Sequence, residues 1–215
     1  MERQDAEGFA ALRTLLKKRP PAAPGERCDF CAVALGTAHG HLIDLEARRI
    51  LCACRPCYLV MEPQGAARGR YKAVPSRYVE IEALAVGAQE WDALQLPIAL
   101  AFFFYNSLEK KMVAFYPGPA GATESLLPLE TWSEIAARAP AFATLEPDVE
   151  AILIQRREEG TRCFIVPIDA AYELVGLIRT AWHGFAGGEE AWRRIEAFFA
   201  TLRERSAGRV TEPVT

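Results

Sequence analysis

The sequence predicts an α+β protein in which a small cysteine-rich module precedes a domain of antiparallel β-hairpins with packed helices. Two observations lead to this prediction. Five of the six cysteines lie between Cys28 and Cys57, and the apolar runs that follow are grouped in pairs, with helical periodicity between and after them. The 215 residues are 51% hydrophobic and 25% charged, which excludes a disordered, collagen-like or coiled-coil chain.

The first 25 residues are predicted to form a helix and a linker. Apolar residues recur at helical spacing from Asp5 to Lys18, and the segment from Pro20 to Gly25 is rich in proline and alanine. A second connection is expected from Gln64 to Arg70, where two glycines fall. The cysteine module is therefore predicted to span residues 26–62.

Residues 70–205 are predicted to form the α+β domain. Hairpin strands are expected at Ile98 to Tyr105, Met112 to Tyr116, Val149 to Ile154 and Cys163 to Val166, and helices at Glu130 to Arg138, Asp169 to Trp182 and Glu189 to Arg205. A hairpin followed by a helix thus occurs twice, either as an internal duplication of a hairpin-plus-helix unit or as two unrelated hairpins. Residues 206–215 are expected to be a disordered tail.

The cysteine window contains two Cys-x2-Cys pairs, Cys28 with Cys31 and Cys54 with Cys57. The tight turn within each pair directs both thiolates at one point, so the two pairs together form a closed tetrahedral site for one metal ion. A closed shell has no position for water or substrate, so the predicted role is structural and no catalytic residue is assigned. No GxGxxG, P-loop, GxSxG or HExxH pattern occurs in the chain.

The residues between the two pairs alternate in polarity like two strands, His41 to Leu45 and Arg48 to Cys52. A chelating turn, a hairpin and a second chelating turn make an N-terminal zinc-ribbon-like four-cysteine module. Zinc is the preferred metal, although the same ligands accept a single iron ion or an iron–sulfur cluster. A redox disulfide between Cys54 and Cys57 is the competing interpretation.

Three more residues are candidate ligands. Cys52 lies two positions before Cys54 on a strand, so it faces the same side and either replaces Cys54 or stays a free thiol beside the site. His39 and His41 lie at the start of the hairpin, but four thiolates already complete the shell. The remaining cysteine, Cys163, is expected in the core of a strand.

Charge is distributed unevenly along the chain. Residues 1–75 carry 12 Lys/Arg and 8 Asp/Glu, a net charge of +4, whereas the remainder carries 13 and 20, a net charge of -7. The basic residues near the cysteines suit an acidic protein partner or a phosphate backbone, but a solvated basic surface is the preferred interpretation. The overall charge of -3 argues against nucleic acid. Without a secretory h-region or an apolar run of about 18 residues, the protein is expected in the cytoplasm with no membrane span.

Several longer motifs are distinctive: CDFC, GHLIDLEARRILCACRPCY, YPGPAGATESLLPLETW, LEPDVEAIL, and VPIDAAYELVGLIRTAW followed by GGEEAW. Together they resemble an uncharacterised bacterial family, a domain of unknown function found among genes for nickel–iron uptake hydrogenases and their accessory proteins. The resemblance runs from Arg27 to Arg205. It implies an accessory role in assembling, stabilising or delivering electrons from a hydrogenase, and it marks as metal-site candidates Cys28, Cys31, Cys52, Cys54 and Cys57.

The sequence therefore predicts a non-catalytic metal-binding accessory protein. The resemblance implies a hydrogenase or its maturation machinery as the protein partner. One alternative is a rubredoxin-like electron carrier with iron at the four-cysteine site, which metal analysis separates from a zinc protein. The other is a zinc-ribbon nucleic-acid-binding protein, which salt-dependent binding to DNA or RNA would reveal.

Overall fold

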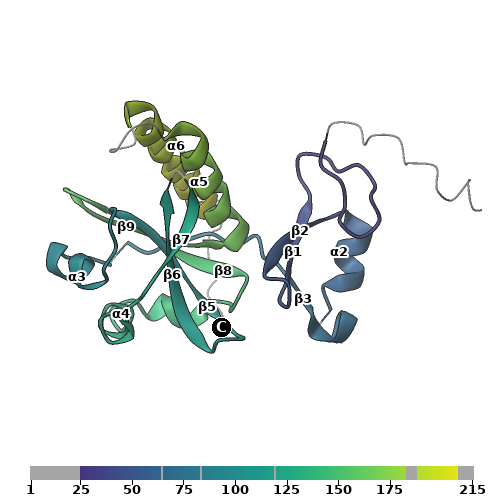
Figure 1. Ribbon diagram of the computed structural model, residues 1–215, viewed down its shortest axis with the longest axis horizontal. Coiled ribbons are helices and arrows are strands. Elements are labelled where there is room, and N and C mark those ends of the chain that lie inside the picture. Colours follow the sequence, from purple (N-terminus) through teal and green to yellow (C-terminus); the bar gives the residue numbers. More distant parts are fainter. Residues whose placement is uncertain (1–24, 64, 83, 119, 183–187, 208–215) are drawn as a thin grey trace, which may run out of the picture.

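The computed structural model describes residues 25–63, 65–82, 84–118, 120–182 and 188–207. In this part of the chain there are two antiparallel sheets, a small sheet of order β2-β1-β3 and a large sheet of order β4-β9-β8-β5-β6-β7. The two sheets lie side by side and are joined by the segment between β3 and β4 (Figure 1). The predicted α+β class with antiparallel sheets is confirmed. The predicted helix over residues 5–18 lies outside the described residues.

The small sheet is built on the hairpin that the sequence predicts. β1 (Gly40–Asp44) pairs with β2 (Arg49–Ala53), and β3 (Tyr71–Ala73) pairs with the other edge of β1. β3 lies beyond residue 62, where the cysteine module was predicted to end. The helix α2 (Arg55–Met61) directly follows β2, and the 3-10 turn η1 (Ala66–Gly69) leads into β3.

Strand alternation gives the small sheet two different faces. Gly40 and Leu42 point toward α2, and a Cβ at Gly40 would lie 2.4 Å from Cδ2 of Tyr58 on that helix, so only glycine fits there. Ile43 and its cross-strand partner Ile50 point the other way and pack against the core beneath α5. The small sheet thus lies between α2 and the large domain (Figure 1).

The large sheet contains both predicted hairpins and two further edge strands. Its strands are β4 (Val79–Glu80), β5 (Leu100–Asn106), β6 (Lys111–Gly118), β7 (Gly121–Ser125), β8 (Glu150–Arg157) and β9 (Gly160–Pro167). β5–β6 and β8–β9 are the predicted hairpins, joined through the β5–β8 pair. Sequence patterning did not identify β4 and β7.

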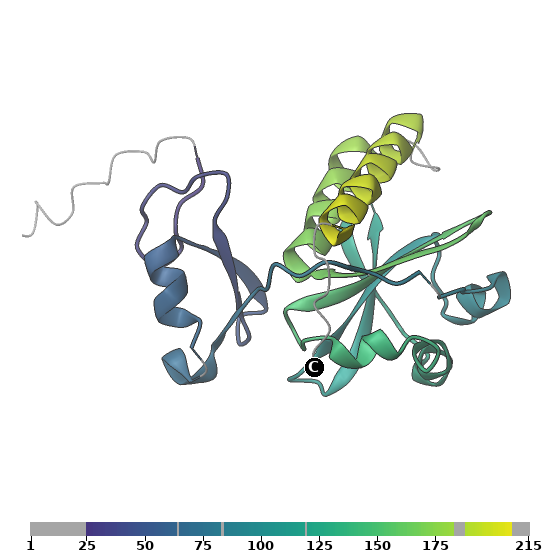
Figure 2. The same ribbon diagram turned by 180° about the vertical axis from the view of Figure 1, so that it is seen from behind.

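Helices cover both faces of the large sheet (Figures 1 and 2). They are α3 (Ala88–Ala93), α4 (Leu129–Ala136), η2 (Pro140–Thr144), α5 (Ile168–Ala181) and α6 (Gly188–Ala207). α5 and α6 pack on one face, and α3 and α4 on the other. The helices that follow the two hairpins therefore cover opposite faces, a difference between the two hairpin-plus-helix units.

Each face of the large sheet has its own apolar core. Phe102 faces α5 and α6, whereas its neighbour Phe103 faces α4 and stacks on Trp132 with ring centroids 4.3 Å apart. α6 continues through Ala207, two residues into the predicted tail, and the rest of that tail lies outside the described residues. None of the described helices combines the length and the apolar content that crossing a membrane requires.

A buried ion pair fixes the segment that joins the two sheets. Arg77 donates from Nε and one terminal nitrogen to the two carboxylate oxygens of Glu150, at 2.8 and 2.6 Å. The Glu150 side chain is fully buried at the start of β8. The Glu146 N–H also donates to this carboxylate at 2.9 Å. A bidentate contact of this kind holds a guanidinium in one orientation. The ion pair therefore fixes the position of the connecting segment on the large sheet.

Candidate metal centre

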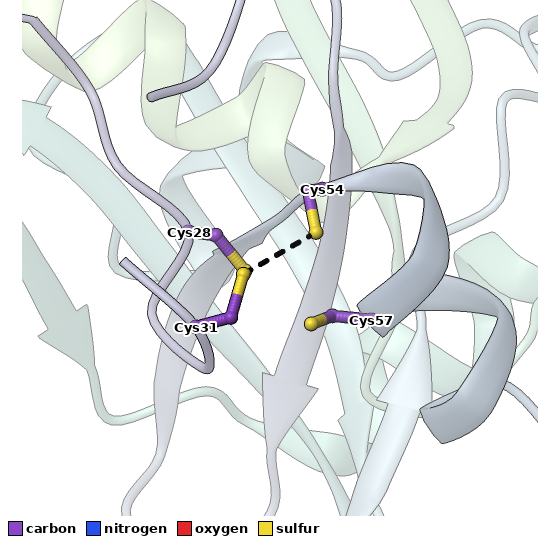
Figure 3. A group of neighbouring side chains, drawn as sticks. All are labelled: Cys28, Cys31, Cys54 and Cys57. Atoms are coloured by element: carbon purple, nitrogen blue, oxygen red, sulfur yellow. Dashed lines mark hydrogen bonds between the residues drawn. The ribbon is translucent and has the colours of Figure 1, made fainter. Parts of the chain in front are cut away.

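Two short segments of the chain bring four cysteines together. Cys28 and Cys31 lie in the turn before the small sheet, Cys54 follows β2, and Cys57 lies in the first turn of α2. Their four Sγ atoms all lie within 4.8 Å of one another, and the side chains point at a common centre (Figure 3). The predicted gathering of these cysteines is confirmed.

Backbone hydrogen bonds shape the first chelating turn. The Ala32 N–H donates to the Cys28 carbonyl at 2.8 Å, and the Cys28 N–H donates to the Val33 carbonyl at 2.9 Å. Asp29 ties the turn to the hairpin, because its N–H donates to the Cys52 carbonyl at 2.8 Å and its Oδ2 accepts from the Cys52 N–H at 2.7 Å. The first pair of thiols is therefore held against β2.

The second pair differs from the predicted turn because it opens a helix. Cys54 is the N-cap residue of α2, and its carbonyl accepts the Tyr58 N–H at 2.9 Å. Pro56 occupies the first turn, where a missing N–H leaves no helical hydrogen bond unmade. Cys54 and Cys57 are three residues apart and so lie on one side of the helix start. The order is chelating turn, hairpin and helix.

The spacing of the sulfur atoms fits a tetrahedral metal ion. Sγ of Cys31 and Sγ of Cys54 are 3.6 Å apart. Four thiolates at about 2.3 Å from one ion have sulfur–sulfur edges of about 3.8 Å. None of the six cysteines forms a disulfide in this structure, and a redox disulfide between Cys54 and Cys57 stays a prediction. The four residues are able to hold a metal ion.

The thiols differ in how readily they ionise. Burial raises the pKa of the Cys28 thiol, but hydrogen bonds from the backbone of Cys54, Cys31 and Phe30 outweigh it and lower that pKa to about 6. The Cys54 thiol, followed by burial and the other thiols, raises the pKa of Cys57 to about 12. One thiolate forms near neutral pH, and further ionisation needs a cation that offsets the accumulating negative charge.

The four thiols differ in exposure as well. Cys28 is 2% exposed, Cys54 and Cys57 are half-buried, and Cys31 is exposed. The site therefore lies at the surface of the protein, on the side of the small sheet that carries α2. Cys163 lies far from it on β9, where it is 1% exposed and burial raises its pKa to about 12. The prediction that Cys163 is a core residue is confirmed.

The three additional candidate ligands form a second group. His39, His41 and Cys52 place one ligand atom each within 4.8 Å of the other two. His41 on β1 is the cross-strand partner of Cys52 on β2, and His39 precedes His41 by two positions. Sequence reasoning did not identify Asp169 of α5, whose Oδ2 lies 2.6 Å from Nδ1 of His41. No local signal links two residues that are 128 positions apart.

Several basic residues near the cysteines are engaged within the protein. Arg70 donates to both oxygens of the fully buried Asp44 at 3.0 and 2.6 Å, and it thereby lowers the pKa of that carboxyl. Arg48 pairs with Glu109 of the large domain at 3.1 Å, and Lys72 donates to the Pro147 carbonyl at 2.6 Å. The first contact lies within the small-sheet unit, and the other two join it to the large domain. Together they leave fewer cations for a phosphate backbone.

The fold and the site together define an α+β protein with a four-cysteine cluster that is able to bind a metal ion. The chain belongs to a family described as a family of unknown function (DUF5947), whose model matches residues 27–206. No curated protein and no solved structure matches the chain. The match includes both sheets, so a single family model spans the cysteine cluster and the large domain.

Proposed function

We propose that this protein is a non-catalytic metal-binding accessory protein whose four-cysteine site holds a structural zinc ion. The observation that carries the proposal is the convergence of four Sγ atoms, those of Cys28, Cys31, Cys54 and Cys57, within 4.8 Å. When bound, zinc supplies a crosslink between the turn before β1 and the start of α2. Four thiolates complete its shell, which is the pattern of a structural site.

The packing around the small sheet supports a structural role. α2 contributes no buried residue, and the buried apolar side chains beneath it are few, chiefly Leu42, Leu51 and Ala53. Burying a leucine side chain stabilises a fold by about 2 kcal/mol, which is too little to fix a turn, a hairpin and a helix in place. A metal crosslink supplies the stabilisation that this small apolar core lacks.

An apolar surface beside the site supports a role in docking. Val33, Leu59 and Val60 are 50%, 47% and 66% exposed, and they lie on the first chelating turn and on α2. This side of the small sheet faces away from the large domain (Figure 1). Exposed apolar patches mark protein-binding surfaces, and each of these three side chains lies within three residues of a cysteine ligand. The partner suggested by the family resemblance is a nickel–iron hydrogenase or a protein of its maturation machinery.

Metal analysis tests the first part of the proposal. Full-length protein purified without oxygen is expected to contain zinc by inductively coupled plasma mass spectrometry, and Cys57→Ser is expected to lose one equivalent. Cys163→Ala is the matched control, because it removes a thiol that lies in the large-domain core. An unchanged metal content in Cys57→Ser would contradict the assignment of the four ligands.

Co-purification tests the second part. Tagged protein from its native host is expected to retain a hydrogenase component, and Val60→Glu is expected to release that component without loss of zinc. Recovery of no hydrogenase component from the wild-type protein would contradict the proposed partner. Equal retention by Val60→Glu would move the docking surface elsewhere.

A second candidate function is electron transfer by a rubredoxin-like iron site. The observation that favours it is the exposure of Cys31, because a surface thiolate ligand brings a bound iron ion close to an electron-transfer partner. An iron protein of this kind is coloured and shows a reversible one-electron potential by voltammetry. A colourless, redox-silent zinc protein would contradict this candidate.

A further inference from the structure

His41 and Cys52 lie on the face of the small sheet that points away from α2, and His39 lies beside them in the segment before β1. His41 and Cys52 are directly opposite each other on β1 and β2, so their side chains share one face. This face also carries Ile43 and Ile50, which pack toward α5. The cluster of His39, His41 and Cys52 therefore lies between the small sheet and the large domain, apart from the four-cysteine site.

The hydrogen bonds of the two imidazoles define where their protons are. Nδ1 of His39 lies 2.9 Å from the Gly36 carbonyl oxygen, which only accepts, so this nitrogen carries a hydrogen. Nδ1 of His41 lies 2.6 Å from Oδ2 of Asp169, and an ionised carboxylate also only accepts. In the neutral state both imidazoles therefore have a bare lone pair at Nε2.

These two lone pairs face each other. Nε2 of His39 and Nε2 of His41 are 3.1 Å apart, and two acceptors at that distance repel unless a positive charge lies between them or beside them. A shared proton and a metal cation both meet this need. Sγ of Cys52 lies within 4.8 Å of one ring nitrogen of each histidine. A metal ion would use this sulfur as a third ligand, whereas a shared proton would not need it.

We propose that His39, His41 and Cys52 form a second transition-metal site, separate from the four-cysteine site. Nitrogen ligands at about 2.05 Å from a tetrahedral ion are about 3.3 Å apart, which is close to the observed separation. Mixed imidazole and thiolate ligands suit a borderline divalent ion such as zinc. Asp169 is a positioning residue, because its carboxylate holds the ring of His41 with Nε2 directed at the site.

Three protein ligands leave one position of a tetrahedral ion for a fourth ligand. The carboxylate of Glu26 lies beside the histidine pair, with its Oε2 3.6 Å from Nε2 of His39 and its side chain 66% exposed. An exposed carboxylate is readily displaced, so the fourth position is open to water or to a donor atom of a partner. Sites with three protein ligands and one exchangeable ligand differ in this respect from closed structural sites.

The location of the second site couples the two parts of the molecule. All three ligands belong to the small sheet or to the segment just before it, whereas Asp169 lies in the first turn of α5. A metal ion on His41 strengthens the hydrogen bond that its Nδ1–H donates, because the cation draws electron density from the ring. Metal occupancy is therefore expected to hold the small sheet against α5.

Cobalt titration of the metal-free full-length protein tests the proposal. Two equivalents are expected to bind. One produces the intense sulfur-to-cobalt absorption of four thiolates, and the other produces weaker, shifted bands from mixed nitrogen and sulfur ligands. The titration is run above neutral pH, since the hydrogen bond to Asp169 raises the pKa of His41 and an imidazolium does not bind metal.

Variants assign each equivalent to its site. His41→Ala and Cys52→Ser are expected to lose the mixed-ligand bands and keep those of four thiolates, whereas Cys57→Ser is expected to do the reverse. Asp169→Asn keeps an acceptor oxygen at the start of α5 and is expected to weaken the second equivalent about 10- to 100-fold. Cys163→Ala should bind both equivalents as wild type does.

A measurement on the wild-type protein tests the second metal site without any variant, so the proposal stays testable even if a variant fails to fold. Zinc X-ray absorption of the fully loaded wild type is expected to contain scattering from imidazole rings. Binding of a single equivalent with sulfur-only scattering would overturn the second site and indicate that the two histidines share a proton. That outcome leaves the four-cysteine site intact, so the two proposals fail separately.

Discussion

The small sheet and the large sheet achieve their order by different means. The large sheet has an apolar core on each face, with fully buried aromatic residues such as Phe102, Phe103 and Phe164. The small sheet is covered on one side by α2, which buries none of its residues, and on the other it contributes Ile43 to the core of its neighbour. The difference supports the proposal that a unit with so small a core of its own depends on a metal crosslink and on the neighbouring domain.

Loss of a cysteine ligand is expected to produce the largest difference in stability between the small sheet and the large sheet. Structural zinc contributes on the order of 10 kcal/mol to the folding of small domains. Cys57→Ser should therefore make residues 26–73 sensitive to limited proteolysis while residues 79–207 stay resistant. The wild-type cleavage pattern in this variant would indicate that the small sheet is stable without the metal. Cys163→Ala again controls for the number of thiols.

A large-to-small substitution in the core of the large sheet is expected to destabilise that sheet and to leave the metal site of the small sheet intact. Phe103 is fully buried and stacks on Trp132, so Phe103→Ala should lower the free energy of unfolding by about 3–5 kcal/mol. Urea denaturation followed by circular dichroism measures this loss. The zinc content should not change, and simultaneous loss of zinc would mean that the two regions unfold as one.

Loss of the ion pair that fixes the connecting segment is expected to lower the free energy of unfolding by less than the core substitution does. Glu150→Gln leaves one acceptor oxygen for Arg77 but removes the charge, which should destabilise the protein by about 2–3 kcal/mol in urea denaturation. The same substitution in an exposed pair is the control, because Glu190→Gln on α6 weakens only solvent-accessible contacts to Arg193 and Arg194. Equal effects in the two variants would contradict a special role for the buried pair.

The smallest expected effect is a dependence on pH within the small sheet. Arg70 lowers the pKa of Asp44 below its ordinary value near 4. This carboxylate therefore stabilises the fold above about pH 4, and that stabilisation is lost as the pH falls through the lowered pKa. The Tm of Asp44→Asn should lie below that of wild type at neutral pH, and the gap should close in acid. A gap that does not change with pH would contradict this account.

Local pattern was enough to predict the elements that bury an alternating or periodic face. The hairpin of β1 and β2, the two hairpins of the large sheet and the long helices α5 and α6 all have this property. β4 and β7 were missed for a physical reason. β4 has two residues, and β7 is the polar sequence GATES, so pairing with β9 and β6 orders these strands, and their own side chains do not.

The metal centre was predictable in part for similar reasons. Cysteine spacing identified the four converging thiols, since chelation imposes a short-range pattern. The helix α2 was missed, although Pro56 in its first turn was an available signal. The contact between His41 and Asp169 depends on how the small sheet packs on α5, which is a property of the tertiary structure. The sequence reasoning therefore placed the histidines beside the four thiols and not in a cluster of their own.

Hydrogen–deuterium exchange with and without a strong zinc chelator tests the central claim most directly. Removal of the metal is expected to raise exchange throughout residues 26–73 and to leave β5, β6, β8 and β9 protected as before. Protection in residues 26–73 that does not change after complete loss of zinc would contradict the claim that a metal at the four cysteines holds the small sheet together.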